Sequence, residues 1–92
     1  MVAKAVNTPF DAGFAPALTL DAQRRGGYAV VVDVAGGDAI ARRLVDLGFR
    51  SGTEVRVERV APFGDPLEVR LHGYRLALRK SEAARVIIAP RP

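Results

Sequence analysis

Side chains able to perform chemistry are few in this sequence, and they stand apart from one another. The chain has one histidine, His72, and no cysteine, which excludes disulfides, thiolate nucleophiles and iron–sulfur ligation. A transition-metal site would have to rest on scattered carboxylates, a donor set that selects poorly for iron or zinc. His72 precedes a glycine between two alternating apolar segments, so we expect it at an exposed turn and not as a metal ligand or proton carrier. The sequence therefore predicts no metal site and no cofactor.

The remaining polar candidates stand where turns and helix caps are expected. Asp65 lies between Gly64 and Pro66 and is expected to accept backbone amides in a turn, in preference to acting as a catalytic carboxylate. Ser51 and Ser81 occupy a turn and a cap without a histidine in a triad context. None of the glycines precedes the Lys-Ser/Thr pair of a phosphate-binding loop or completes a GxGxxG motif. We expect a protein that is not an enzyme and has no small-molecule substrate.

An apolar loop is the strongest candidate for contact with another molecule. The segment APFGDP at 61–66 has an apolar tip that is either a packed lid or a docking surface, and loops on rigid scaffolds often carry function. Phe63 is the preferred contact residue. Neighbouring arginines offer a basic face, although arginines on strand and helix exteriors are often simply solvated. The expected partner-binding residues are Pro62, Phe63, Gly64, Asp65, Pro66, Arg42, Arg43 and Arg79.

The composition is that of a globular domain with a basic surface. The 92 residues are 49% hydrophobic and 26% charged, which suffices for one modest core. The net charge of +4 suits an anionic partner, an acidic protein face or the inner membrane surface, and it selects none of them. The longest apolar run, residues 28–32, is far shorter than a membrane span, and the first nine residues lack the apolar stretch of a secretory leader. We expect a cytoplasmic protein.

A strand and a helix precede the candidate loop. Residues 28–34 are apolar on both parities as far as Asp33, which predicts a strand buried on much of both faces. Asp38 is a suitable N-cap for a helix at 39–47. Gly48 favours a left-handed helix end, after which Phe49 is expected to pack back on the helix. The apolar face of the helix is formed by Ile40, Leu44 and Leu47.

Alternating segments flank the loop and form the clearest local structure. Residues 54–60 alternate between valines and charged side chains, with a bulge expected near 59–60. Residues 67–78 are typical of a hairpin with a two-residue turn, which sets Arg70 opposite Arg75 on its outer face. Such a like-charge pair lowers stability unless solvent or an anion relieves it. The inner face should be core and pairs Leu67 with Leu78, Val69 with Leu76 and Leu71 with Tyr74.

The last segments complete a mostly β fold. Ser81 is expected to cap a short helical turn at 82–84, and residues 86–88 form a closing strand before Pro90. About five strands, one short α-helix and one helical turn indicate a small β-barrel and argue against a βαβ sheet. The expected organisation is a flexible N-terminal arm at 1–17 and one barrel domain at 18–89.

Three blocks of sequence together resemble the ordered signature of the FeoA family. They are RLVDLGFRSG at 43–52, APFGDP at 61–66 and LALRKSEA at 76–83, and the resemblance runs from about residue 18 to residue 88. The family often has proline at the position of Ser51, a departure that leaves the turn at Gly52 intact. The resemblance implies an SH3-like β-barrel.

The same resemblance implies a function. The family is encoded beside, or fused to, the membrane ferrous-iron transporter FeoB and is thought to act on its cytoplasmic GTPase part. The resemblance therefore implies that this chain is a non-catalytic accessory protein of ferrous iron uptake, recruited to the inner membrane face by its partner. Two alternatives stay open: a basic SH3-like barrel that binds nucleic acid, which the scarcity of stacking aromatics disfavours, and a stand-alone relative of the C-terminal domain of iron-dependent repressors. Self-association also stays open.

Overall fold

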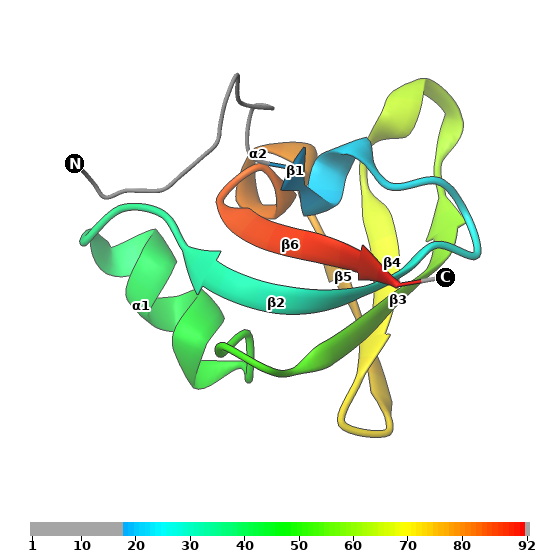
Figure 1. Ribbon diagram of the computed structural model, residues 1–92. Helices are drawn as coiled ribbons and strands as arrows, with labels where there is room; N and C mark the ends of the chain where they lie inside the picture. Colours follow the sequence, from blue (N-terminus) through cyan, green and yellow to red (C-terminus); the bar gives the residue numbers. More distant parts are fainter. Residues whose placement is uncertain (1–17, 92) are drawn as a thin grey trace, which may run out of the picture.

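The computed structural model describes residues 18–91 as a curved antiparallel sheet with two short helices (Figure 1). The six strands pair in the order β1-β6-β2-β3-β4-β5. The predicted mostly β fold with one helix and one helical turn is confirmed, whereas the expected arm at 1–17 falls outside the described residues. The elements are β1 (Leu18–Thr19), η1 (Leu20–Ala22), β2 (Tyr28–Val34), α1 (Ala39–Asp46), β3 (Glu54–Val60), η2 (Pro62–Gly64), β4 (Leu67–Leu71), β5 (Tyr74–Leu78), α2 (Lys80–Ala83) and β6 (Val86–Arg91).

One apolar core lies inside the curved sheet. Among the described residues no polar or charged side chain is buried, so apolar burial stabilises this cysteine-free domain. Every candidate functional side chain consequently lies on the surface. The largest fully buried side chains are Leu20, Val31, Leu44, Phe49, Val55, Val57, Leu67, Val69, Leu71, Leu78 and Val86.

Helix α1 begins where the sequence indicates and ends one residue earlier than predicted, at Asp46, and it packs by a narrower face. Asp38 caps it, since its carboxylate accepts from the backbone N–H of Ala41 at 3.1 Å. Ala41 and Leu44 are buried, whereas Ile40 is 42% exposed, so the prediction that Ile40 faces the core is wrong. The helix contacts the sheet along an i, i+3 line, which turns Ile40 towards solvent. Phe49 is fully buried in the core beside Leu44, as predicted.

The β4–β5 hairpin has the predicted register. Leu67 pairs with Leu78 and Leu71 with Tyr74 across the two strands. Tyr74 is nevertheless 40% exposed, so its assignment to the core is wrong. It lies on β5, an edge strand of the sheet, and its hydroxyl donates to the carbonyl of Leu47 at the end of α1. Hairpin tip and helix end are thereby joined.

Strand ends and bulges differ from the predictions in detail. The register between β3 and β4 shifts between Val57 and Arg59, slightly earlier than expected. Strand β2 is less buried than predicted, because only Ala29 and Val31 are buried while Tyr28 and Val32 are exposed. Strand β6 continues through Pro90 to Arg91 and does not end before the proline. Beyond its pairing with the short β1, β6 pairs only with β2 among the described strands, and proline is tolerated on such an edge.

Candidate partner-binding surface

Residues 62–66, called here the docking loop, form a compact turn between β3 and β4 (Figure 1). The backbone N–H of Ala61 donates to the carbonyl of Pro66 at 3.0 Å, which closes the base of the loop. The N–H of Gly64 donates to the carbonyl of Ala61 at 2.8 Å, and the Asp65–Pro66 peptide is cis. Two prolines and two internal hydrogen bonds therefore fix the shape of the loop.

Phe63 projects from this fixed loop into solvent. Its exposed fraction is 101%, the highest among the exposed large apolar side chains of residues 18–91. Its backbone φ of 68° lies in the left-handed region, which residues other than glycine adopt rarely. Of the two interpretations of the loop, packed lid or docking surface, the exposure of Phe63 argues against a packed lid within the described domain.

Asp65 and Arg79 connect the docking loop to the start of α2. The carboxylate of Asp65 accepts from the backbone N–H of Lys80 at 3.0 Å, a backbone amide as the sequence suggested. Ser81 therefore does not cap the helix: α2 begins at Lys80, two residues earlier than predicted, and Arg79 is its N-cap. A groove of about 390 Å³ between loop and hairpin is lined by Asp65, Pro66, Ala77, Leu78 and Arg79. Loop, groove and Arg79 thus form one continuous surface.

The three predicted arginines do not gather at one place. Arg43 pairs with the carboxylate of Glu82 on α2. The second oxygen of Glu82 accepts from the backbone N–H of Arg79 at 2.9 Å, so Arg43 and Arg79 meet across this residue. Arg42 points elsewhere, because its guanidinium donates to the carbonyl of Gly37 at 2.9 Å. The structure brings the loop, Arg79 and Arg43 to one side of the domain and leaves Arg42 apart.

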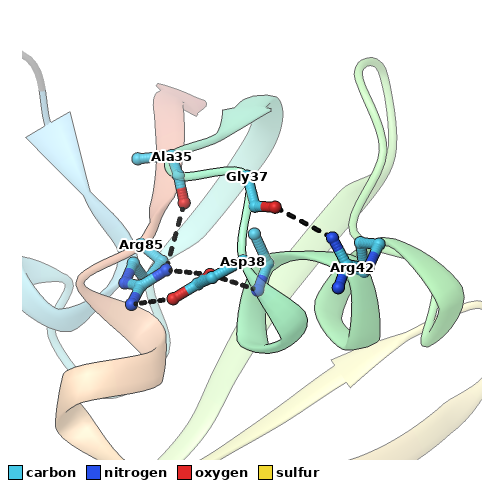
Figure 2. Close-up of polar contacts among 6 residues, drawn as sticks. Ala35, Gly37, Asp38, Arg42 and Arg85 are labelled. Atoms are coloured by element: carbon cyan, nitrogen blue, oxygen red, sulfur yellow. Dashed lines mark hydrogen bonds and ion pairs between the residues drawn. The ribbon is translucent and has the colours of Figure 1, made fainter.

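A clamp between the two helices was not anticipated from the sequence. Figure 2 shows Arg85, just after α2, making a bidentate ion pair with Asp38 at the start of α1, with N–O distances of 2.8 and 2.9 Å. The same guanidinium donates to the carbonyl of Ala35 at 3.4 Å. A Cβ at Gly36 would lie 2.7 Å from the Arg85 Nη1 atom, so a larger residue would displace the guanidinium. Only the N-cap role of Asp38 was visible in the sequence.

The clamp changes the titration of both groups. The hydrogen bond from Arg85, assisted by the N–H of Ala41, holds the pKa of Asp38 well below its ordinary value of 3.8. The hydrogen bond to Asp38 in turn raises the pKa of Arg85. Both side chains stay charged at neutral pH, and their role is to hold α1 against the segment that leads into β6.

His72 lies exposed at the hairpin tip, where the sequence placed it. Its Nε2 atom is 3.3 Å from the carbonyl oxygen of Gly48, at the end of α1. Within residues 18–91 no three or more histidine, cysteine, aspartate or glutamate side chains are grouped as a metal site requires. None of the helices in this range is long and apolar enough to cross a bilayer.

Comparison with known proteins identifies the family. The family model described as FeoA domain matches residues 18–90. Among solved structures, FeoA of Stenotrophomonas maltophilia, described as a prokaryotic SH3 domain protein complexed with zinc, has 45% sequence identity and a TM-score of 0.72. The match covers 79% of this chain and 91% of that chain, and that protein is described as a candidate activating factor of ferrous iron transport.

A larger relative carries a similar segment within a longer chain. The Fe(2+) transport protein A/Fe(2+) transporter FeoB fusion protein of Porphyromonas gingivalis is 34% identical over 61 residues. These residues are 66% of this chain and only 7% of that relative, so the present chain spans a small part of the fusion protein.

A repressor structure shares the fold alone. The manganese-dependent transcriptional repressor in complex with manganese has a TM-score of 0.74 over 86% of this chain and 39% of that chain, at 21% identity. The SH3-like fold is therefore common to several kinds of protein. The family match, in contrast, extends over nearly all described residues, together with the predicted signature blocks and the similar FeoA structure. This chain belongs to the FeoA family.

Proposed function

We propose that this chain is a non-catalytic accessory protein of ferrous iron uptake that binds the cytoplasmic GTPase part of a FeoB-type transporter. Phe63 carries the proposal, since a fully exposed ring on a fixed loop is the kind of aromatic anchor that dominates protein interfaces. The partner is suggested by the fusion relative, in which a FeoA-like segment and a FeoB transporter are one chain. Such fusions keep two binding partners at high effective concentration.

The docking loop, Arg79 and Arg43 supply the proposed contact. Burying the ring of Phe63 in a partner pocket contributes about 1.5–3 kcal/mol, and Arg79 adds a charge beside the neighbouring groove. To alter the activity of a GTPase, the bound domain must favour one conformation of the partner over another. The affinity should therefore differ between the nucleotide-free, GDP-bound and GTP-bound states.

Binding to the isolated GTPase part of the FeoB-type transporter from the same genome tests the proposal. We expect Phe63→Ala to weaken binding by roughly 30-fold, equivalent to about 2 kcal/mol. The matched control is Val32→Ala, which truncates another exposed apolar side chain, on β2, and should leave the affinity unchanged. Isothermal titration calorimetry in each nucleotide state measures both. Failure of the parent protein to bind in any state would contradict the proposal.

The other two functions stay predictions. Likeness to the repressor concerns the fold alone, and a salt titration with a single-stranded oligonucleotide tests nucleic-acid binding, because phosphate-driven affinity falls steeply with salt.

A further inference from the structure

The outer face of the sheet carries a row of arginines that crosses five strands. Pairing between strands joins Arg91 on β6 to Tyr28 on β2 and Tyr28 to Arg56 on β3. It then joins Arg56 to Arg70 on β4 and Arg70 to Arg75 on β5. All five side chains are exposed. We call Arg56, Arg70, Arg75 and Arg91 the arginine ladder. Since neighbouring strands are about 4.8 Å apart, the ladder spans about 19 Å along the sheet.

Two of the four arginines in the ladder, Arg56 and Arg75, have a positive charge that no carboxylate within residues 18–91 pairs with. Arg91 pairs with Glu54 at 3.3 Å and Arg70 with Glu58 at 3.1 Å. Within residues 18–91 no carboxylate lies within ion-pair distance of Arg56 or of Arg75, although both stand directly opposite Arg70. Like charges directly opposite each other destabilise an antiparallel pair. The fold thus tolerates two repulsive pairs in succession, which an anion between the guanidinium groups would relieve.

A shallow groove lies beside the ladder. It measures about 310 Å³ and is lined by residues that include Tyr28, Glu54, Arg56, Arg70 and His72. The hydroxyl of Tyr28 donates to Glu54 at 2.5 Å, which fixes the ring as one wall. The surface therefore offers a concave site with an aromatic wall and the guanidinium group of Arg56, which has no carboxylate partner among the described residues. Arg75, on the strand beyond Arg70, adds a second such group outside the groove. Guanidinium groups bind carboxylates in a planar, bidentate geometry.

The carboxylates of β3 indicate which anion fits. Glu54 and Glu58 stand two residues to either side of Arg56 on the same alternating face of the strand. Together with their arginine partners they interrupt the positive charge along β3, which suits separated carboxylates better than the continuous charge of a nucleic-acid backbone. A peptide with separated carboxylates avoids them, because acidic side chains two residues apart on an extended segment are about 7 Å apart. The side chains of Arg56 on β3 and Arg75 on β5 are long enough to bind two such carboxylates.

We propose that the arginine ladder binds an extended acidic segment of a partner protein, whose carboxylates pair with Arg56 and Arg75. This surface is separate from the docking loop: in Figure 1 the loop lies at the top of the β4–β5 hairpin, and the turn near Arg70 and Arg75 lies at the bottom. The inference goes beyond the proposed contact with the transporter and does not depend on it.

A titration of the isotopically labelled full chain tests the inference, with backbone amide resonances as the readout. The probe is a peptide of alternating Glu and Thr, compared at low ionic strength with a Gln–Thr peptide and a single-stranded oligonucleotide of equal length. We expect saturable shifts at Tyr28, Arg56, Arg70 and Arg75 with the acidic peptide alone. Raising the salt should weaken the binding because these charges are exposed.

Charge-reversal variants complete the test. Arg56→Glu and Arg75→Glu should each weaken peptide binding at least tenfold, whereas Arg42→Glu changes the net charge equally on α1 and should leave it unchanged. Arg56→Gln and Arg75→Gln should give smaller losses, and the dispersion of the amide resonances verifies folding. Absence of saturable shifts, equal losses in the Arg42→Glu control, or binding of the oligonucleotide in preference to the peptide would each overturn the proposal. None of these outcomes bears on Phe63 or on binding of the GTPase part.

Discussion

At the scale of single residues, Phe63 has a conformation that folding alone does not explain. A non-glycine residue in the left-handed region costs about 1–3 kcal/mol, and the fully exposed ring gains nothing from burial. The next residue is Gly64, a residue type that tight turns usually contain, so Phe63 is the unusual residue of this turn. An aromatic ring held outwards at this cost is consistent with selection for contact and not for stability.

Gly48 illustrates the opposite case, in which the backbone requires glycine for packing. Its φ is 115°, and a Cβ would lie 2.7 Å from the Cδ2 atom of His72. We expect Gly48→Ala to lower the free energy of unfolding by about 1–3 kcal/mol through left-handed strain and to displace His72 from the helix end. Urea unfolding measures the free energy.

Two other glycines serve as matched controls for this prediction. Gly52 has a φ of 91° with open space around its Cβ position, so Gly52→Ala isolates backbone strain from the steric clash. Gly37 has neither feature, and Gly37→Ala should be close to neutral. Equal stability of the variants at 48 and 37 would show that the helix end tolerates a side chain.

At the scale of elements, the ion pair between Asp38 and Arg85 joins the start of α1 to the end of α2. Asn caps helices as well as Asp does, so Asp38→Asn keeps the cap and removes only the ion pair. We expect this variant to melt at a lower temperature than the parent at neutral pH. Because folding lowers the pKa of Asp38, its contribution is complete above the unfolded value of 3.8 and is lost as the pH falls from there towards the folded pKa.

Thermal unfolding followed by circular dichroism across this pH range checks the prediction. The difference in melting temperature between parent and Asp38→Asn should narrow below pH 3.8. Asp46→Asn is the control, since Asp46 lies on the same helix and forms no ion pair within residues 18–91. A constant difference at every pH would contradict the role of the ion pair.

The hairpin provides a second prediction at this scale. Arg75→Glu replaces a repulsive cross-strand pair with an attractive one opposite Arg70. We expect the free energy of unfolding to rise by about 0.2–1 kcal/mol, measured by urea unfolding at low ionic strength, with a gain that shrinks in high salt. Arg75→Gln should give a smaller increase. A loss of stability in both variants would show that the repulsion has no energetic weight.

At the scale of the whole molecule, the strands were predictable where local pattern decides structure. Alternation and a two-residue turn determined the register of the β4–β5 hairpin, including the opposition of Arg70 and Arg75. The rest of the ladder was not predictable, since it depends on pairing with β3 and β6. Bulges and long connections set the registers of these two strands. The Asp38–Arg85 contact joins residues 47 positions apart and leaves no local pattern.

The candidate site was predictable only in part for the same reason. The docking loop was visible from its prolines and glycine, and Asp65 from its turn context. Two features of the site depend on how α1 lies against α2. Arg42 points away from the loop, and Arg43 meets Arg79 through Glu82. Ile40 and Tyr74 were predicted to be buried, and both are exposed. They lie at the margins of the core, where an apolar pattern does not determine which side chains are buried.

Strand β4 begins at the docking loop and is crossed by the arginine ladder three residues later, at Arg70. At about 3.4 Å per residue, the separation along the strand is about 10 Å, and the paired hairpin makes it a rigid spacing. A single protein that presents an apolar pocket and an acidic strip at this distance would engage both ends in one encounter. The rigid hairpin would then select partners by the distance between these two features, and it would bind more weakly to proteins that have them at another separation.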